Sequence, residues 1–437
     1  MLLRNSKREV PLAKPASTNF TSLMVPRWSL SVASRCLSST ATSVLETPIS
    51  GPEKRLVCLM FLICKSLLTF SLCSFSIRKV SFFSRIPCAP FPNPRRVQYH
   101  LTGPGATAFL EKITPSDVQN LPTHQSTLSA LLHSTGGICD DTIITRLEPE
   151  KFYIVTNAGC RAKDKAFFDE QLSSWRTANN PAVDLTELEN QGLVALQGPL
   201  SAQILEALLA NPDQADLQGT YFGQSKYLQL RITSGDVTVL ASRGGYTGED
   251  GFEISIPPSS TVAVTETLLQ NAGPEKLRLA GLGARDSLRL EAGMCLYGHD
   301  LDDNTTPVEG ALSWIIAKSR RETGGFNGAK TILPQLKPKS KGGTGVEKRR
   351  VGLVVEGAPA REGAEIVGED GEVIGKVTSG CPSPSLKKNI AMGYVRDGMH
   401  KSGTEFGVKV RGKVRKAVVT KMPFIPSKYW KGGVSPA

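Results

Sequence analysis

Beyond residue 350 the chain consists almost entirely of short alternating segments separated by Gly turns, and this pattern constrains the fold more than any other feature. The segments are RVGLVVEG, AEIVGEDGEVIGKVTSG, IAMGYV and FGVKVRGKVRKAVVTKM. Successive side chains of a strand point to opposite faces of a sheet, so such segments form half-buried strands. Several short strands with Gly turns are typical of a small barrel or sandwich. We therefore predict an all-β domain, a barrel or a sandwich, over residues 351–437.

Residues 97–336 mix helical and strand patterns. GPGATAFLEKI (103–113) and AKDKAFFDEQLSSW (162–175) have a helical period. LQLRITS and VTVLASR flank a Gly-Asp turn, which is a strong hairpin signal. The fold class predicted is α+β, with a mixed α/β core over 97–336, a basic Gly-rich linker over 337–350 and the all-β domain. The linker is expected to be a solvated loop kept extended by repulsion among its charges.

The positive charge of the chain belongs to its first part. The chain carries 52 basic and 40 acidic side chains, a formal net charge of +12. Residues 1–97 hold 14 basic and 3 acidic side chains, whereas the remainder holds 38 and 37. The body therefore has no overall field that would attract a polyanion, and we expect no nucleic-acid partner.

Residues 1–45 have the chemistry of a mitochondrial presequence. They contain six basic side chains, a single acid at Glu9 and abundant Ser and Thr, and RCLSS (35–39) resembles a matrix-processing site. The alternative is a disordered basic tail. We expect the mitochondrial matrix as the location of the mature protein.

Residues 46–96 match no ordinary pattern. Sixteen of the 22 residues in 56–77 are apolar, which is enough to cross a bilayer of ~30 Å. However, Lys65 near the middle would cost about 2.5–3.5 kcal/mol there. Residues 78–96 show neither helical nor alternating periodicity. We expect no membrane association, and interpret this atypical segment as a product of intron translation or a skipped exon.

The cysteines indicate a reduced compartment and no structural metal. Five of the nine lie in the first 97 residues, and the other four, Cys139, Cys160, Cys295 and Cys381, are far apart in sequence. No CxxC pair or Cys/His spacing suited to zinc is present. We therefore expect no metal site.

Three clusters of polar residues and glycines are candidates for chemistry. GGICDD (136–141) ends in two carboxylates at the start of a strand, so one is expected to face a cleft and its neighbour solvent; a β-turn with Asp as turn former fits equally. In GGYTGEDGFE (244–253), Glu253 alternates with Phe252, and a buried carboxylate there would need the N–H donors of a ligand ring. In GLGARDSLRLEAG (281–293), Arg285 either clamps a ligand carboxylate or pairs with a nearby acid.

These clusters, in their order along the chain, resemble a known family. Together with NAGC, ALQGP, TTPVEGALSW, TSGCPSPSLKKNIAMGYV and KMPFIPSKYW, they are similar to the aminomethyltransferase, or T protein, of the glycine cleavage system, from about Val97 to Trp430. The resemblance implies a folate-binding α/β core and a C-terminal barrel around a cavity. It also implies transfer of an aminomethyl group from the lipoyl arm of H protein, within the glycine cleavage complex, to tetrahydrofolate, with release of ammonia.

The resemblance also implies roles for individual residues. Asp141 matches the catalytic aspartate, which contacts the folate nitrogen at position 10 and stabilises a cationic intermediate. Glu253 matches the glutamate that hydrogen-bonds the pterin edge. Substrate contact or pocket lining is implied for Arg285, Tyr429, Tyr246, Asn157 and Arg361.

The sequence leaves two alternatives open. The folate-binding iron–sulfur assembly factor of the same superfamily has a KGCYxGQE-type loop, and this chain has EGALSWIIAK (309–318) in that region, without the cysteine. A catalytically inactive folate- or H-protein-binding scaffold, anchored by residues 56–77, is the second. It is kept because residues 49–96 lack the family's Gly-Lys-Met stretch and DVSHM motif.

Overall fold

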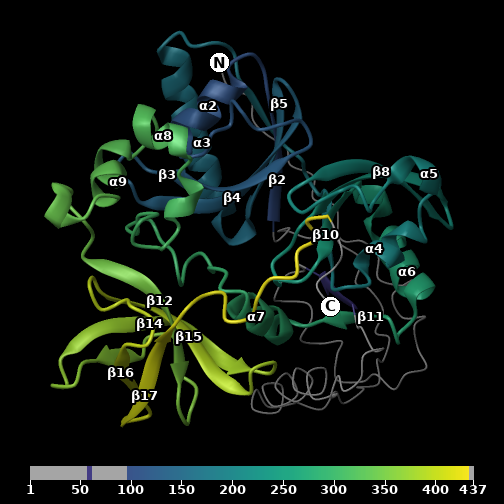
Figure 1. Ribbon diagram of the computed structural model, residues 1–437. Coiled ribbons are helices and arrows are strands. Elements are labelled where there is room, and N and C mark those ends of the chain that lie inside the picture. The colour runs from purple at the N-terminus through teal and green to yellow at the C-terminus, as the bar shows by residue number, and fades with distance from the viewer. Residues whose placement is uncertain (1–56, 62–95, 433–437) are drawn as a thin grey trace, which may run out of the picture.

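The computed structural model describes residues 57–61 and 96–432. The predicted presequence, its processing site and most of the atypical segment lie outside these residues. Three β-structures organise the described part: a five-stranded sheet, a six-stranded sheet and a closed barrel (Figure 1). The predicted fold class, a mixed α/β core followed by a barrel, is confirmed.

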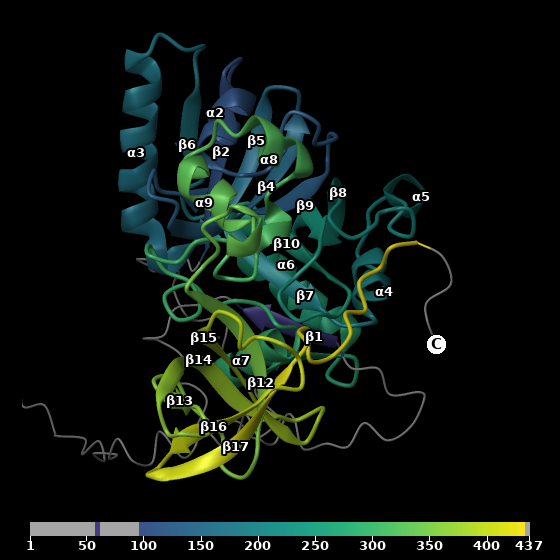
Figure 2. The ribbon, with the colours of Figure 1, turned by 60° about the vertical axis from the view of Figure 1, so that its left-hand side comes forward.

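The five-stranded sheet has the order β3-β4-β5-β2-β6. Its strands are β2 (Arg96–Thr102), β3 (Ser126–Leu132), β4 (Ile138–Glu148), β5 (Lys151–Asn157) and β6 (Asp184–Glu187). Helices α2 (Ala106–Ile113) and α3 (Arg161–Thr177) cover one face, because each places apolar side chains such as Phe109 and Phe168 in the core beneath. The short helices α8 (Lys318–Thr323) and α9 (Ala329–Gln335) lie beside the same sheet (Figure 2).

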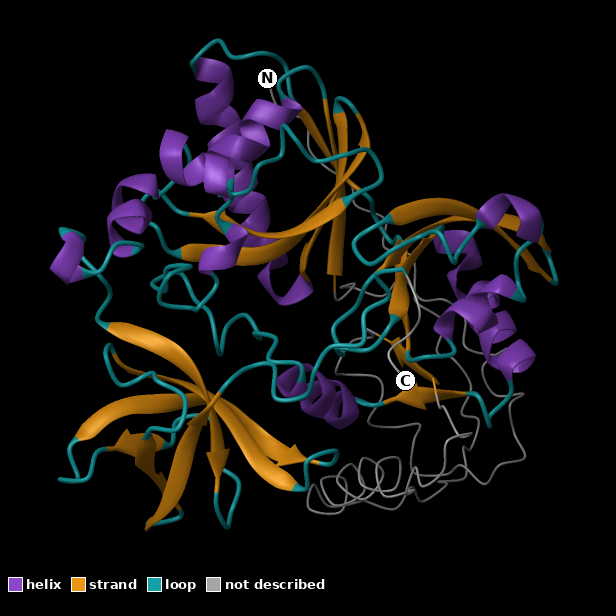
Figure 3. Cartoon of the chain, viewed as in Figure 1, coloured by secondary structure: helices purple, strands orange, loops and turns teal. Residues whose placement is uncertain are grey.

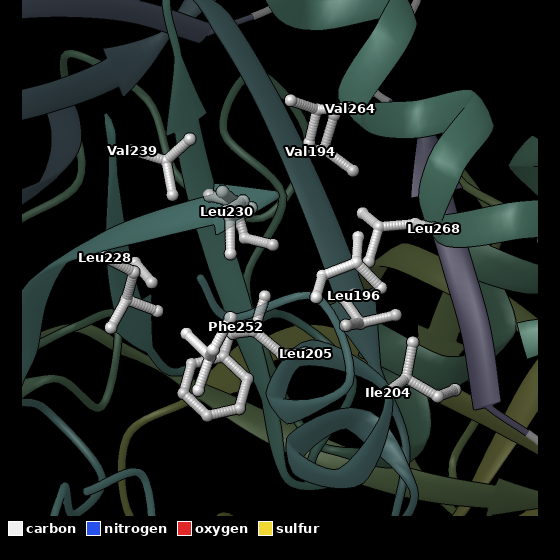
Figure 4. Close-up of a cluster of buried hydrophobic side chains, with 14 of the residues drawn as sticks. Val194, Leu196, Ile204, Leu205, Leu228, Leu230, Val239, Phe252, Val264 and Leu268 are labelled. Carbon is white, nitrogen blue, oxygen red and sulfur yellow. The ribbon is translucent and has the colours of Figure 1, made fainter. Parts of the chain in front are cut away.

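The six-stranded sheet has the order β11-β1-β7-β10-β9-β8. Its strands are β1 (Val57–Phe61), β7 (Gly192–Gln197), β8 (Ser225–Ile232), β9 (Gly235–Arg243), β10 (Gly251–Ile256) and β11 (Leu277–Ala280). Figure 4 shows its core, in which Leu205 of α4 (Ser201–Glu206) and Leu268 of α6 (Thr261–Ala272) approach Leu196, Leu230 and Phe252. The one-turn helix α5 (Pro212–Ala215) precedes β8.

Strand β1 comes from the segment that the sequence left unplaced. It pairs in parallel with β11, where Leu59 is opposite Leu279, and antiparallel with β7, where Leu59 is opposite Leu196. The backbone of 57–61 therefore connects β11 to β7 and so to the rest of the sheet. Among the described residues, none of the helices has the length and apolar character needed to span a bilayer.

The barrel closes in the order β12-β15-β14-β13-β16-β17. Its strands are β12 (Lys348–Val355), β13 (Glu365–Val367), β14 (Val373–Ser383), β15 (Lys388–Arg396), β16 (Glu405–Val410) and β17 (Lys413–Thr420). Figure 3 shows that this lobe consists of strands and loops, with helix α7 (Leu282–Glu291) between it and the six-stranded sheet.

The predicted linker is only partly a solvated loop. Lys337, Lys339 and Lys341 are exposed, as expected. Strand β12 already begins at Lys348, and Arg350 is buried, donating a 2.8 Å hydrogen bond from Nε to the Gly310 carbonyl oxygen. The basic residues at the end of this stretch therefore belong to the barrel and its contacts. The expectation of an extended loop considered only repulsion between like charges, and not the hydrogen-bond acceptors of neighbouring residues.

A candidate folate site between the two sheets

The two sheets meet face to face along β2 and β10. Gln98 on β2 accepts hydrogen bonds from the hydroxyls of Ser255 on β10 (2.6 Å) and Tyr153 on β5 (2.7 Å). Two residues earlier on each strand, Arg96 and Glu253 approach each other, with 3.6 Å between Nη1 and Oε2. Alternation along the strands therefore places both pairs in the same interface.

Glu253 occupies the side of β10 opposite the hydrophobic core. Phe252 is fully buried in the core that Figure 4 shows, whereas the Glu253 side chain is 9% exposed and faces Arg96. The sequence expected one of this pair to point inward. Both are buried, since the second face of the six-stranded sheet is covered by the five-stranded sheet.

Asp141 lies on the other side of Arg96. It is half-buried on β4, and the side-chain amide of Asn157, at the end of β5, donates a 2.8 Å hydrogen bond to its Oδ1. Burial raises the pKa of the Asp141 carboxyl, while the positive charge of Arg96 and the Asn157 hydrogen bond act in the opposite direction. Asp141, Asn157, Arg96 and Glu253 thus form one charged cluster between the sheets.

Asp140 differs from its sequence-based expectation. It was expected to face solvent if Asp141 faces a cleft, but its side chain is fully buried. Its two carboxylate oxygens accept hydrogen bonds from the backbone N–H (2.8 Å) and the side-chain amide (2.9 Å) of Asn157. The expectation was wrong because α3 covers this side of β4 and leaves it no access to solvent.

Arg285 and Tyr246 extend the cluster toward α7. The Arg285 guanidinium lies over the Tyr246 ring, 4.5 Å from its centre, and the Tyr246 hydroxyl donates to the Cys295 carbonyl oxygen. One turn later on α7, Arg289 is buried and donates to Asp300 at 2.8 Å and to Ser379 of the barrel at 2.9 Å. Helix α7 is therefore fixed to the barrel, which sets the position of Arg285.

Two other residues implied by the resemblance lie elsewhere. Tyr429 stacks on Phe222 with ring centres 4.0 Å apart, within the strap of residues 421–430 that leads from the barrel back to the six-stranded sheet (Figure 2). Arg361 is exposed in the barrel and donates to the Gly380 carbonyl oxygen at 3.0 Å. In the described part of the chain, neither contacts Asp141 or Glu253.

Arg96 is the site residue that the sequence analysis missed. Its guanidinium lies between Glu253 and Asp141, its side chain is 10% exposed, and its Nε has no hydrogen-bond partner among the described residues. Arg96 directly precedes the family-like stretch VQYHLTGPGA and ends the atypical segment. No motif marked it, because its neighbours become known only when β2 is placed beside β10.

Two groups of side chains have atoms close enough to surround a cation. In the first, His133, Cys139 and Asp303, the Asp303 carboxylate already contacts His133 at 2.8 Å and Lys163 at 3.1 Å. The second consists of Asp140, Cys160 and Asp164, behind Asp141. The positive charge of Lys163 therefore already balances Asp303 in the first group. In the second group, neither Asp140 nor Asp164 forms an ion pair with a Lys or Arg of the described residues.

Comparison with known proteins agrees with this architecture. Residues 95–320 match the model of the GCVT N-terminal domain, and residues 348–425 match the glycine cleavage T-protein C-terminal barrel domain. The chain is 49% identical over 335 residues to a probable mitochondrial aminomethyltransferase of Schizosaccharomyces pombe, covering 77% of this chain and 81% of the relative. It is 44% identical over 348 residues to the mitochondrial aminomethyltransferase of mouse, covering 79% and 82%.

A solved structure shows the same fold. The glycine cleavage system aminomethyltransferase T of Bartonella henselae matches with a TM-score of 0.69 and 33% identity, over 86% of this chain and 89% of that one. Neither the iron–sulfur assembly factor nor the scaffold alternative is favoured by these relatives. The chain belongs to the glycine cleavage T-protein family of aminomethyltransferases.

Proposed function

We propose that this chain transfers the one-carbon unit of an aminomethyl-lipoyl group, carried by H protein, to tetrahydrofolate, releasing ammonia and forming methylenetetrahydrofolate. The observation that carries the proposal is the convergence of Asp141, Asn157, Arg96 and Glu253 between two sheets. This arrangement supplies one carboxylate for a reacting nitrogen and a second for the edge of a ring that bears N–H donors.

Asp141 would act through its negative charge and not as a covalent nucleophile. The aminomethyl carbon becomes an iminium cation when it leaves the lipoyl sulfur, and a nearby carboxylate stabilises that charge. The same carboxylate accepts a hydrogen bond from folate N10 and makes this nitrogen more nucleophilic. Both actions require the ionised form, which Arg96 and Asn157 favour against the effect of burial.

Glu253 would hold the pterin ring in competition with Arg96. Without folate, the described ion-pair partner of this carboxylate is Arg96 at 3.6 Å, a distance too long for a strong hydrogen bond. Pterin N–H donors would therefore meet an acceptor that is only loosely held. Arg285, stacked on Tyr246, forms no ion pair with the described residues, and its guanidinium would meet the carboxylate end or the carbonyl groups of folate.

The proposed donor is H protein, an acidic lipoyl carrier in this family, and the proposed location is the mitochondrial matrix. The location is supported by the presequence chemistry of residues 1–45 and by relatives that are named mitochondrial. The exposed lysines at 337, 339 and 341 are suited to steer an acidic carrier.

The proposal is tested with the full chain, aminomethylated H protein and tetrahydrofolate. Methylenetetrahydrofolate and ammonia should appear in equal amounts, and neither should form when either substrate is left out. Calorimetric titration with tetrahydrofolate alone separates binding from transfer. Folate binding without any product would favour the inactive scaffold, and the absence of both would exclude a folate site in this chain.

A further inference from the structure

A second polar cluster lies behind Asp141, on the side that faces α3. Its members are Asp140 of β4, Cys160 at the end of the turn after β5, and Asp164 of α3. One oxygen or sulfur atom from each lies within 4.8 Å of those from the other two. Asp140 and Asp164 are both completely buried.

The two carboxyl groups differ in their hydrogen bonds. Asp140 accepts from the backbone and side-chain amides of Asn157. Both oxygens of Asp164 are buried and receive no hydrogen bond of regular geometry from the described residues. The Thr156 hydroxyl and the Asp140 carboxyl lie beside Asp164 and lower its pKa through side-chain hydrogen bonding, but burial has the larger effect and raises it. A buried carboxyl without a well-formed hydrogen bond therefore favours its neutral form.

The charges around this pair do not compensate it. Among the described residues, no Lys or Arg forms an ion pair with Asp140 or Asp164; Lys163, the cation that acts on Asp164, is bound to Asp303. The other titratable neighbours are Asp141, Cys139 and Cys160, and burial raises the pKa of both thiols, so they stay neutral. On the β2 side, Tyr99 is neutral, and Arg161 and Glu187 pair with each other at 2.6 Å.

We propose that Asp140 and Asp164 share one proton and together carry a single negative charge. This pair fixes the side-chain amide of Asn157, and the amide in turn positions Asp141 for transfer. The inference rests on the proposed role of Asp141. Asp140 accepts both N–H groups of Asn157 and is the anionic member. The amide then has one remaining hydrogen, which points to Asp141 Oδ1.

The pKa values of both carboxyl groups are shifted in the direction that keeps a proton on the pair. Burial raises the pKa of both Asp140 and Asp164, and the charge of Asp141 raises them further. Because these pKa values lie above those of the unfolded chain, the stability that the proton confers is lost as the pH rises through the folded-state values. A second charge would then be buried beside Asp141, and both folding and transfer should suffer at alkaline pH.

Two isosteric variants separate this role from simple packing. Asp164→Asn keeps the shape of a neutral carboxyl group and has no proton to lose. Above the pKa of the pair, the turnover of the wild type should fall by about tenfold per pH unit. The turnover of Asp164→Asn, relative to its own value at pH 7, should stay level over the same range. Its Tm should also fall less at alkaline pH. Asp140→Asn replaces one acceptor by an NH₂ group facing Asn157, so its turnover should be low at every pH. Asp169→Asn, on the exposed side of α3, should behave as wild type.

Infrared spectra test the shared proton without reference to catalysis. The wild type at neutral pH should show the C=O band of a buried protonated carboxyl, and Asp164→Asn should lack it. If the band is absent, or if the purified protein contains one equivalent of a metal ion that is lost in Asp164→Asn, the shared proton is wrong. If the band is present but both variants have the wild-type alkaline decline, the pair does not position Asp141. Loss of the proposed activity of Asp141 itself would leave the band unchanged.

Discussion

The Asn157 side-chain amide donates a 2.8 Å hydrogen bond to Asp141, which comes from the neighbouring strand. The same amide nitrogen is 2.9 Å from Asp140. One asparagine therefore holds two adjacent carboxylates that point to opposite sides of β4. This relationship connects the proposed catalytic group to the buried pair behind it, so changes on either side of the strand should affect transfer.

Replacing Arg96 by Met should move the acidic limb of the turnover profile to higher pH. Arg96 opposes the effect of burial on the Asp141 pKa, and Met fills similar space without charge. Asp141 would then protonate at a higher pH, and the active, ionised form would be lost sooner as the pH falls. The pH dependence of kcat measures this. Arg231→Met, at an exposed position of β8, is the control, and an unchanged limb would show that Arg96 does not act on Asp141.

Glu253→Ala should mainly weaken folate binding. Pterin donors left without an acceptor cost about 1–3 kcal/mol, and the buried Arg96 also loses its partner. Titration calorimetry should show the loss in affinity, while turnover at saturating folate changes much less. Glu253→Gln keeps an acceptor oxygen, so its affinity for folate should lie between those of Glu253→Ala and the wild type. A loss confined to turnover would instead place Glu253 with the reacting atoms.

Replacing Lys337, Lys339 and Lys341 by Gln should slow the H-protein-dependent reaction at low salt. The three side chains are exposed. Steering by such a patch acts on association, with an effect of about tenfold, and screening over ~10 Å at 0.1 M salt removes it. The comparison is kcat/KM for H protein at low and high salt. A variant with the same change of charge elsewhere, Lys165, Lys388 and Lys401 to Gln, is the control. If both variants match the wild type at low salt, residues 337–341 only connect the domains.

Leu59→Pro should destabilise the chain, because β1 lies between two strands. An internal strand uses its N–H groups on both neighbours, and proline removes one. We expect a loss of about 1–3 kcal/mol in the free energy of unfolding, measured by urea denaturation. Leu59→Val keeps the N–H group and suits a strand. Equal stability of the proline variant and the wild type would show that residues 57–61 do not complete the sheet.

Local patterns predicted the elements better than their surroundings. The Gly-Asp hairpin became β8 and β9, and the alternating segments beyond residue 350 became the barrel, because turn chemistry and periodicity are local. The solvent-facing expectation for Asp140 was wrong, since alternation does not reveal that α3 covers the second face of β4. Arg96 and β1 were missed for a related reason: Glu253, the ion-pair partner of Arg96, and β7, which pairs with β1, lie more than a hundred residues away in sequence.

The family resemblance implied more of the candidate site residues than the spacing of residues alone did. Asp141, Asn157 and Glu253 converge between the sheets, and Arg285 and Tyr246 lie together beside them. Tyr429 and Arg361 have contacts of another kind, with an aromatic ring and with a barrel carbonyl. Their proposed roles in substrate binding remain predictions, since a contact made only with a bound ligand leaves no trace in neighbouring side chains.

The central claim is that the negative charge of Asp141 drives transfer, and Asp141→Asn measures it most directly. The variant keeps shape and removes charge, so kcat for methylenetetrahydrofolate formation should fall by about 10²–10⁴-fold, with a much smaller change in the Kd for tetrahydrofolate. Asp169→Asn, exposed on α3, should leave both unchanged. A kcat equal to that of the wild type would contradict the account.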